Sequence, residues 1–454
     1  MTSDTREFAA VILAAGKGTR MKSELHKVLH SIAGRAMLDH LLASVEELGP
    51  SRTVLVAGHC SDQLEKAVGD RAVMALQEPQ LGTGHAVQQA QQALAGFAGD
   101  VLVLYGDVPF VRAATMRRML DRLHEDDAPP AVVLAFRASD PGAYGRVVSE
   151  DGRTVAKMVE FKDASEVERR IDLCNSGMLA VRAADLFALL GRIGNDNAAG
   201  EYYLPDIVMK ALEGGRASAF VETDESEVRG INSRSELAAA EAQWQQLRRD
   251  EAMAAGASLR APETVFFSYD TKLGRDVTIE PNVVFGPGVT VHDNVRIKAF
   301  SHLEGCELHP GAQVGPFARL RPGAVLEQGA FVGNFVEVKN AVLHQGAKAS
   351  HLTYLGDAEV GAGANIGAGT ITCNYDGYFK HRTVIGERAF IGSNSALVAP
   401  VTIGADAIVA AGSTVSRDVA AGELRMVRGE QLVKLGWADR FHDTMKKKKA
   451  EKRA

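Results

Sequence analysis

A short glycine-rich segment near the start of the chain has the composition of a phosphate-binding turn. It reads Leu13-Ala14-Ala15-Gly16-Lys-Gly18-Thr19-Arg20-Met21, and Lys27 follows. Glycines at the end of a strand let the backbone approach a phosphate closely, so that N–H groups bind it. The spacing fits neither a P-loop nor a dinucleotide fingerprint, because no Gly-Lys-Ser/Thr is present and Met21 stands at the third glycine position. Taken alone, such a segment is usually a structural turn.

A second candidate is the sequence Tyr105-Gly106-Asp107, which ends an expected strand at residues 101–105. A carboxylate at the C-terminal end of a parallel strand is suitably placed to bind Mg²⁺. Taken singly, Asp107 is about as often a helix cap.

Polar residues also gather in the C-terminal half, where a repeat loses its phase: Arg321, Lys339, His351, Tyr354 and Asn365. An insertion at residues 372–381 follows them. Loops that interrupt a repeat commonly carry function, and a neutral imidazole is suited to general-base work. Outside this group, lone histidines such as His302, His309 and His344 are typical of a protein surface.

These residues are carried by two halves with different sequence periods. Over the first ~230 residues, short apolar segments alternate with amphipathic helical stretches. The expected strands are residues 8–13, 53–57, 101–105, 131–136 and 177–181. Such alternation predicts a Rossmann-like α/β domain with a mostly parallel sheet, which binds ligands beyond the carboxyl ends of its strands.

A helix is expected next, at residues 233–256. Ser233 and Glu236 form a capping-box pattern, an apolar stripe runs along Leu237, Ala240, Trp244 and Leu247, and Gly256 can end the helix. At 1.5 Å per residue this segment is about 35 Å long, so it could act as an arm between domains.

From about residue 262 the aliphatic residues recur every six positions. The three runs are Val277, Val283, Val289 and Val295; Leu308, Val314, Leu320, Leu326, Val332 and Val338; and Ile385, Ile391, Leu397, Ile403, Val409 and Val415. A hexapeptide period predicts a solenoid of short parallel strands with the aliphatic side chains stacked inside. The repeats do not reveal the hand of the coil, and the general crossover rule favours a right-handed one.

The composition limits the function classes. A chain of 454 residues with 46% hydrophobic and 24% charged residues is typical of a soluble protein of roughly two to four domains. A net charge of -6 argues against bulk nucleic-acid binding. The acidic N-terminus lacks the features of a signal peptide, and four scattered cysteines fit a reducing cytoplasm. The basic run at residues 446–453 is typical of a solvated, disordered tail, and a minor alternative is that it attracts a phosphate-rich ligand.

The glycine-rich segment resembles the signature of sugar-1-phosphate nucleotidyltransferases, Leu-x-x-Gly-x-Gly-Thr-x-Met followed by Pro-Lys. His26 stands where the family usually has that proline. The resemblance implies that Arg20 and Lys27 stabilise the leaving pyrophosphate and that Asp107 and Asn232 bind Mg²⁺. It also implies a sugar-nucleotide site made of Leu13, Ala14, Ala15, Gly16, Lys27, Gln77, Gly82, Thr83, Tyr105, Gly106, Asp107, Gly145, Glu160, Asn175 and Asn232.

Residues 315–401 resemble the acetyltransferase domain of a bacterial family that joins N-acetylglucosamine-1-phosphate uridylyltransferase to glucosamine-1-phosphate N-acetyltransferase. The matches include Gly-Asn-Phe-Val-Glu-Val-Lys and His-Leu-Thr-Tyr-Leu-Gly-Asp-Ala. By this resemblance the coil is left-handed and His351 is the general base. The sugar phosphate is bound by Arg321, Lys339, Tyr354 and Asn365, and acetyl-CoA by Ala368, Asn374, Tyr375, Ser393, Ala411 and Arg428.

The family implies a uridylyltransferase domain at residues 1–232, a linker helix at 233–256, a β-helix at 257–437 and a basic tail at 438–454. It also implies a cytoplasmic homotrimer that uses acetyl-CoA, UTP and Mg²⁺ to make UDP-N-acetylglucosamine for peptidoglycan and lipopolysaccharide. No nucleic-acid partner and no membrane span are expected. Two alternatives stay open at this point: a uridylyltransferase with a purely structural solenoid, and a nucleotide-sugar sensor without turnover.

Overall fold

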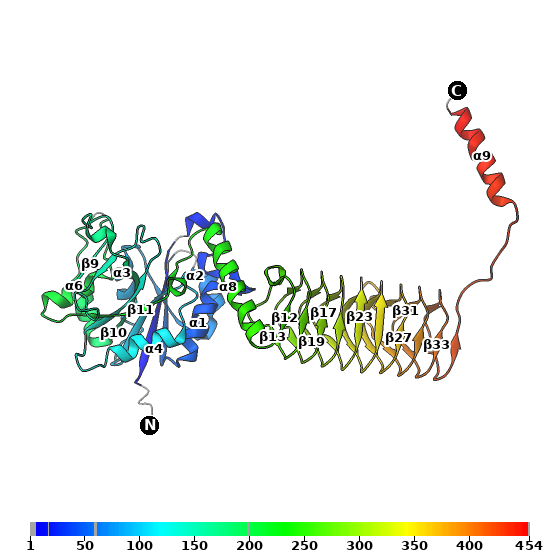
Figure 1. Ribbon diagram of the computed structural model, residues 1–454, viewed down its shortest axis with the longest axis horizontal. Helices are drawn as coiled ribbons and strands as arrows, with labels where there is room; N and C mark the ends of the chain where they lie inside the picture. Colours follow the sequence, from blue (N-terminus) through cyan, green and yellow to red (C-terminus); the bar gives the residue numbers. More distant parts are fainter. Residues whose placement is uncertain (1–5, 17, 59–60, 198, 453–454) are drawn as a thin grey trace. The chain divides into compact units, whose positions relative to one another are not determined.

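The computed structural model describes residues 6–16, 18–58, 61–197 and 199–452 (Figure 1). The chain divides into two compact units, Met1–Leu247 and Arg248–Ala454, which are described separately below.

The N-terminal unit is built on a mixed sheet in the order β11-β7-β10-β6-β1-β4-β5. Its strands are β1 (Phe8–Ala14), β4 (Arg52–Ala57), β5 (Val73–Leu76), β6 (Asp100–Tyr105), β7 (Ala131–Arg137), β10 (Leu173–Arg182) and β11 (Ala219–Thr223). Strand β1 lies between β4 and β6 and is parallel to both, as the sequence predicts. Strand β10 is antiparallel to β6 and β7, a reversal that apolar periodicity does not reveal.

Both faces of this sheet are buried. Val11 and Leu13 of β1 belong to one apolar cluster, whereas Ala10 and Ile12 belong to another on the opposite face. Helices pack against them: α1 (Met37–Glu47), α2 (Ser61–Val68), α3 (Thr83–Gln89), α4 (Ala113–Arg122), α5 (Ala183–Leu190), α6 (Asp206–Glu213) and the short α7 (Glu225–Val228). Small ribbons are formed by β2 (Ser31–Ile32) with β3 (Arg35–Ala36) and by β8 (Arg146–Val148) with β9 (Lys157–Val159). The α/β class predicted from the sequence is therefore confirmed.

Helix α8 (Arg234–Ala254) contains the boundary between the two units. Its start is capped by Ser233, whose Oγ accepts a hydrogen bond from the Glu236 N–H at 3.3 Å. Its end has paired bonds from Gly256 N–H to Met253 O and from Ala257 N–H to Ala252 O, with a φ of 102° at Gly256. This is the Schellman arrangement that a glycine after a helix favours.

The C-terminal unit is a left-handed parallel β-helix with three faces, drawn in Figure 1 as a stack of short arrows from β12 to β35. The first face holds β12 (Ser258–Leu259), β14 (Thr278–Ile279), β17 (Arg296–Ile297), β20 (Gln313–Val314), β23 (Phe331–Asn334), β25 (Lys348–His351), β27 (Asn365–Ile366), β30 (Phe390–Ile391), β33 (Ile408–Val409) and β35 (Leu424–Arg425). The second holds β13 (Lys272–Leu273), β16 (Thr290–Val291), β19 (Cys306–Leu308), β22 (Ala324–Leu326), β29 (Thr383–Ile385) and β32 (Val401–Ile403).

The third face holds β15 (Val284–Phe285), β18 (His302–Leu303), β21 (Arg319–Leu320), β28 (Ile371–Cys373), β31 (Ala396–Val398) and β34 (Thr414–Val415). Strands β24 (Glu337–Leu343) and β26 (Tyr354–Val360) turn a corner and so contribute to the second and third faces. Every one of the sixteen aliphatic positions in the three predicted runs is at most 1% exposed. The predicted interior of the solenoid is confirmed.

The corners of the coil are made by residues with positive φ, stacked from turn to turn. One such column contains Phe300, Phe317 and Phe335, with φ of 58°, 53° and 56°, whose rings stack on one another. A left-handed conformation costs a residue with a side chain roughly 1 kcal/mol or more. Here stacking with the next turn offsets that cost, so the corner does not require glycine.

The basic C-terminal segment differs from its prediction. Residues Trp437–Glu451 form a helix, α9, instead of an irregular tail, and no side chain in it is buried. Alanine, lysine and glutamate are strong helix formers, which explains a helix that buries none of its side chains among the described residues. Among the described residues, no helix is both long and apolar enough to cross a membrane.

Three histidines of the N-terminal unit make its stability depend on pH. Burial lowers the pKa of His26, His30 and His40 below the usual 6.5. The unfolded chain therefore binds protons near pH 6.5 that the native unit excludes. The free energy of unfolding should fall as the pH drops below 6.5, by up to about 1.4 kcal/mol per pH unit for each excluded proton.

Urea melts at pH 7.5 and 5.5, followed by the fluorescence of Trp244 in a Trp437→Phe background, measure this effect within the N-terminal unit. The variant His26→Asn keeps an acceptor for the Val28 N–H but binds no proton, so it should show a smaller loss. Equal stability of the parent at the two pH values would contradict the expectation.

Candidate active sites

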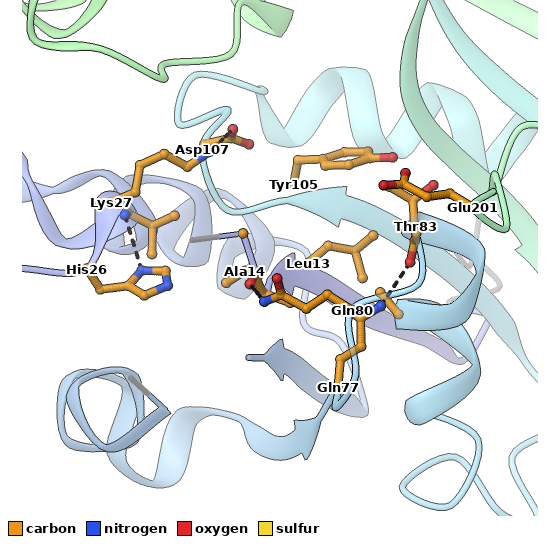
Figure 2. A pocket seen from close by; sticks show the side chains of 15 residues that line it. Leu13, Ala14, His26, Lys27, Gln77, Gln80, Thr83, Tyr105, Asp107 and Glu201 are labelled. Carbon is orange, nitrogen blue, oxygen red and sulfur yellow. Dashed lines mark hydrogen bonds and ion pairs between the residues drawn. The ribbon is translucent and has the colours of Figure 1, made fainter. Parts of the chain in front are cut away.

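A cavity of about 310 Å³ in the N-terminal unit opens at the carboxyl ends of β1 and β6 (Figure 2). Many of the predicted sugar-nucleotide residues line it: Leu13, Ala14, Ala15, Gly16, Lys27, Gln77, Gly82, Thr83, Tyr105 and Asp107. They come from five separate segments of the chain. Parallel pairing places the ends of β1 and β6 side by side, because Leu13 is in register with Tyr105 and the Gly106 N–H donates to Leu13 O at 2.9 Å.

Lys27 lies between the two predicted metal ligands. Its Nζ is 2.6 Å from Asp107 Oδ2 and 3.0 Å from Asn232 Oδ1. The Lys27 and Asp107 side chains are 12% and 17% exposed, so this ion pair is well shielded from water. The two oxygens therefore converge on a single cationic group. A carboxylate and an amide oxygen are ligands suited to Mg²⁺, so the donor set fits the expected metal.

Backbone contacts bring Asn232 to this place from far along the chain. The Ile231 N–H donates to Asp107 O at 3.0 Å, and the Asn232 N–H donates to Glu236 Oε2 at 2.6 Å. The capping glutamate of α8 thus bonds the residue before the N-cap. The start of α8 therefore helps to position Asn232 next to Lys27 and Asp107.

The loop that carries the predicted sugar-nucleotide residues Gln77 and Gly82 is fixed by internal hydrogen bonds. The Gln77 side chain is buried and donates from Nε2 to Gly82 O at 2.9 Å. Gly82 has a φ of 106°, and an added Cβ would lie 2.6 Å from Tyr202 O. Only glycine fits between these two segments, and this explains why the loop packs closely beside the cavity.

Three other predicted residues, Gly145, Glu160 and Asn175, line a smaller cavity of about 30 Å³ together with Asp206. The Asn175 N–H donates to Gly145 O at 2.9 Å, and a Cβ on Gly145 would meet Glu160 Oε1 at 3.1 Å. Burial, followed by repulsion from Asp206, raises the pKa of Glu160. A carboxylate in this state gains from hydroxyl donors such as those of a sugar.

Arg146, beside this cavity, holds the surrounding loop. It is 1% exposed and donates to the backbone oxygens of Pro141, Tyr144, Gly142 and Arg169. Its guanidinium also lies over the Phe161 ring. A buried charge is tolerated there because several carbonyl dipoles face it.

The residue that departs from the family signature, His26, adopts a φ of -55°, which a proline would also adopt. Its N–H donates to Gln63 Oε1 at 2.8 Å, a bond that proline cannot make. The backbone is therefore held by a hydrogen bond in place of a ring. Arg20 lies on a short 3-10 helix, is exposed, and is not among the residues that line the cavity.

Among the polar side chains that line the cavity, sequence reasoning missed Gln80 and Glu201. Gln80 Nε2 donates to Ala15 O and so ties the glycine-rich segment to the neighbouring loop. Glu201 lies in the stretch Gly-Glu-Tyr-Tyr, which carries no recognisable period; its polar character was the only available signal.

In the C-terminal unit, the predicted base and three predicted acetyl-CoA contacts stand in one column along a corner of the coil. His351 is in register with Asn334 on the preceding turn. Backbone bonds then step onward, from Gly369 N–H to Leu352 O, Asn394 N–H to Ala368 O and Gly412 N–H to Ser393 O. The column is Asn334, His351, Ala368, Ser393 and Ala411. Arg428 Nη1 donates to Ala411 O at its end.

Asn334, which the sequence analysis did not select, contacts the predicted base. Its Oδ1 lies 2.5 Å from His351 Nδ1. An amide oxygen can only accept, so it favours the tautomer with a proton on Nδ1 and a lone pair on Nε2. His351 is exposed, which leaves Nε2 accessible to a substrate.

Cationic groups gather on the adjacent face. Arg321 directly follows β21 and lies at the position equivalent to Lys339 on β24. Arg321 Nη1 donates to Glu337 Oε1 at 2.8 Å. Hydrogen bonding with Lys380, and then charge repulsion by Lys380 and Arg321, lower the pKa of Lys339. Lys380 comes from the insertion and was not selected from the sequence. Three positive groups so close together favour an anion such as a phosphate.

The insertion itself is ordered by short bonds. Asn374 Nδ2 donates to Asp357 Oδ2 at 2.5 Å, and Asp376 accepts from the Phe379 N–H at 2.7 Å and from His381 Nε2. The exposed Tyr375 hydroxyl donates to Gly377 O. Of the other predicted residues, Tyr354 starts β26 beside this loop and Asn365 starts β27.

Family models match parts of both units. A model of the MobA-like NTP transferase domain matches residues 10–168, and the bacterial transferase hexapeptide model matches residues 270–305 and 382–417. Among solved structures, a CMP:2-keto-3-deoxy-manno-octonic acid synthetase complexed with CTP matches 53% of this chain at 18% identity. Its TM-score of 0.42 is too low to bear on the argument.

Whole-chain relatives are much closer. "Bifunctional protein GlmU" of Sphingopyxis alaskensis is 72% identical over 98% of each chain. The protein of the same name from Novosphingobium aromaticivorans is 74% identical over 98% of this chain and 99% of its own. That of Zymomonas mobilis is 56% identical over 98% and 99%.

The chain belongs to the GlmU family. It is accordingly a bifunctional uridylyltransferase and acetyltransferase, with a nucleotidyltransferase domain followed by hexapeptide repeats. A purely structural role for the GlmU solenoid and a sensor without turnover, both left open by the sequence, are thereby set aside.

One glycine controls the position of Tyr105 in the GlmU uridylyltransferase cavity. Gly177 has a φ of 84°, and an added Cβ would lie 2.9 Å from the Tyr105 ring. Gly177→Ala should therefore displace this ring and lower uridylyl transfer by on the order of tenfold or more. Gly215→Ala is the matched control, because Gly215 has a φ of 79° and open space around it.

Both variants should lose roughly 1 kcal/mol of stability from the left-handed backbone, measured by urea unfolding. A difference in uridylyl-transfer kcat/KM between them isolates the clash. Equal kcat/KM values would contradict a positioning role for Gly177.

Proposed function

We propose that the C-terminal unit transfers an acetyl group from acetyl-CoA to glucosamine-1-phosphate. The N-terminal unit then transfers UMP from UTP to the resulting N-acetylglucosamine-1-phosphate and releases pyrophosphate. The product, UDP-N-acetylglucosamine, would serve peptidoglycan and lipopolysaccharide synthesis. The observation that carries the proposal is that each unit of one chain holds its own cluster for phosphate chemistry, around Lys27 and around Arg321.

In the uridylyl transfer, a phosphate oxygen of the sugar attacks the α-phosphate of UTP. Both reactants are anions, so catalysis requires positive charge and alignment more than a general base. Lys27, supported by Asp107 and Asn232, is the one lysine or arginine among the described residues that line the cavity. The glycine-rich segment 13–16 supplies backbone N–H groups for the phosphates, and the loop around Gln77 and Gly82 faces the uracil.

Asp107 and Asn232 would hold Mg²⁺, which supplies charge neutralisation for the phosphates when bound. Lys27 Nζ contacts both ligand oxygens, so in a metal-bound site its ammonium group would be free to contact the substrate phosphates. Glu160 and Asn175 would bind sugar hydroxyl and amide groups in the smaller cavity. Arg20 would approach the pyrophosphate from the exposed rim.

In the acetyl transfer, the amine of glucosamine-1-phosphate attacks the thioester carbonyl directly. His351 Nε2 takes a proton from the amine, while Asn334 holds the opposite ring nitrogen. The tetrahedral intermediate collapses with release of the CoA thiolate. Ser393, in the same column, would donate a hydrogen bond to the oxyanion. No acyl-enzyme is needed.

The sugar phosphate would bind to Arg321 and Lys339, with Lys380 closing the site from the insertion. Tyr354 and Asn365 would orient the sugar ring. Acetyl-CoA would extend along the column from His351 past Ala368 and Ser393 to Ala411. At about 4.8 Å per turn these residues span roughly 14 Å, which suits an extended pantetheine arm. Asn374, Tyr375 and Arg428 would complete this site.

We also infer a homotrimer acting in the cytoplasm. The acetyl-transfer residues of one chain lie on an open surface, and Leu432, Val433 and Leu435 are each at least 79% exposed. Neighbouring coils would cover such apolar groups and close the site. UTP and acetyl-CoA are soluble substrates; nucleic acid and membrane partners are not part of the proposal.

Reciprocal variants separate the two reactions. Asp107→Asn should lower uridylyl transfer by on the order of a hundredfold or more and leave acetyl transfer intact. His351→Ala should lower acetyl transfer by about 10²- to 10⁴-fold and spare uridylyl transfer. The two steps are assayed apart, by pyrophosphate release and by CoA release.

His302→Ala is the control for the second variant, because His302 is an exposed histidine on β18 outside the column. It should retain both activities. If acetyl transfer survived in His351→Ala, the assignment of the base would be wrong.

Lys380 provides a sharper test of the phosphate site. Lys380→Ala removes one charged contact, worth about tenfold or more in binding, so it should raise the KM for glucosamine-1-phosphate. The KM for acetyl-CoA should not change. Lys348→Ala, an exposed lysine on β25, is the control. An equal rise for both substrates would place Lys380 outside the sugar-phosphate site.

A further inference from the structure

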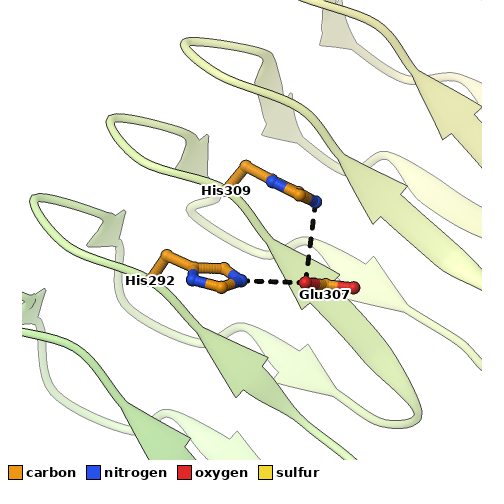
Figure 3. A group of neighbouring side chains, drawn as sticks. All are labelled: His292, Glu307 and His309. Carbon is orange, nitrogen blue, oxygen red and sulfur yellow. Dashed lines mark hydrogen bonds and ion pairs between the residues drawn. The ribbon is translucent and has the colours of Figure 1, made fainter.

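Two histidines and a glutamate converge on the second face of the β-helix, away from the residues assigned above (Figure 3). His292 Nε2 is 2.8 Å from Glu307 Oε1, and His309 Nε2 is 3.6 Å from the same oxygen. One nitrogen from each ring and one carboxylate oxygen all lie within 4.8 Å of one another. His309 is therefore not the lone surface histidine that the sequence suggests.

The coil itself produces this convergence. Strands β16 and β19 pair in parallel, with Val291 opposite Leu308. The residues that follow, His292 and His309, therefore stack on successive turns, with ring centroids 5.1 Å apart. Glu307 lies two residues before His309, so both side chains point outward while Leu308 points into the core.

Another histidine on this face, His344, shows that proximity alone does not make such a group. His344 also contacts two carboxylates, at 3.0 Å each, but it uses Nδ1 for Glu327 and Nε2 for Glu359. Its two carboxylates lie on opposite sides of one ring and so cannot share a cation with one ring nitrogen. At Glu307, by contrast, two Nε2 atoms point to one oxygen, as Figure 3 shows.

We propose that His292, Glu307 and His309 form a binding site for a divalent transition-metal ion such as Zn²⁺. Two imidazoles and a carboxylate match the preferences of zinc and its neighbours. Metal–ligand distances of about 2.0–2.2 Å require only small side-chain rotations from the observed positions. The three side chains are 41%, 44% and 38% exposed, so water can fill a fourth coordination position.

The bonding within the group is compatible with this role. The hydrogen bond from His292 lowers the pKa of Glu307, which keeps the carboxylate ionised. A metal would replace the proton now shared between the ring and the carboxylate. Bound in this way, it would cross-link the turn that contains β16 to the turn that contains β19, and so stabilise this part of the coil.

The full-length protein, freed of metal with a chelator, is titrated with ZnCl₂ in a calorimeter in the presence of excess Mg²⁺. Magnesium saturates oxygen sites such as Asp107 but competes weakly for imidazole. One saturable event per chain is expected. It should disappear in His292→Gln/His309→Gln, and Glu307→Gln should weaken it about tenfold or more. His344→Gln and His302→Gln are the matched controls and should retain it.

Two further measurements distinguish a metal site from a group of side chains joined only by hydrogen bonds. Binding of Co²⁺ should give visible absorption bands in the parent protein that are absent from the double variant. Zn²⁺ should also raise the thermal transition of the parent but not of the double variant. Retention of the Zn²⁺ event in His292→Gln/His309→Gln, its loss in His344→Gln, or no event in the parent would overturn the proposal.

Discussion

Parallel strand pairing in register is the constraint that places functional groups in both units. When two parallel strands are paired, the residues that follow them become neighbours, whatever their separation along the chain. In the N-terminal unit the pair Leu13 and Tyr105 places the glycine-rich segment beside Asp107. In the β-helix the pair Asn334 and His351 orients an imidazole, and the pair Val291 and Leu308 stacks two more.

The two sites solve the same electrostatic problem differently. In the proposed uridylyl-transfer cavity, the ammonium group of Lys27 contacts a carboxylate and an amide oxygen. The charge of Lys27 is therefore balanced and little exposed to water. The proposed acetyl-transfer surface instead brings Lys339 and Lys380 close to Arg321, and the repulsion among these positive groups favours binding of an anion. The first arrangement suits a reaction with a metal ion, and the second suits recognition of a phosphate that does not react.

The features predicted correctly from the sequence are those that follow from the spacing of apolar residues. Six-residue spacing identified the buried positions of the coil, and short apolar segments identified β1, β4, β6 and β7 within two residues at each end. It did not predict that β10 runs antiparallel, because strand direction leaves no trace in hydrophobic alternation. The helix at Trp437–Glu451 was not predicted, because a run of like charges is typical of disordered tails, although its residues also have high helix propensity.

The sites were predicted less evenly. Residues within family motifs lie along the cavity and the column, although their roles stay predictions. Asn334 and Lys380 were missed for different reasons: Asn334 acts through its place one turn before His351, and Lys380 through the fold of an insertion. Both depend on which residues the coil superimposes, and that is fixed only when the length of every turn is known.

The stacked corners also determine how this protein can change in length. Each turn bonds only the turn before and the turn after, and its corners accept phenylalanine, asparagine or glycine alike. A whole turn of about eighteen residues can therefore be added or removed between residues 262 and 308 without a new core. Each such event would shift the acetyl-transfer residues along the axis by about 4.8 Å and leave their mutual geometry unchanged. The number of turns in the solenoid can therefore change in evolution while the arrangement of the acetyl-transfer residues stays the same.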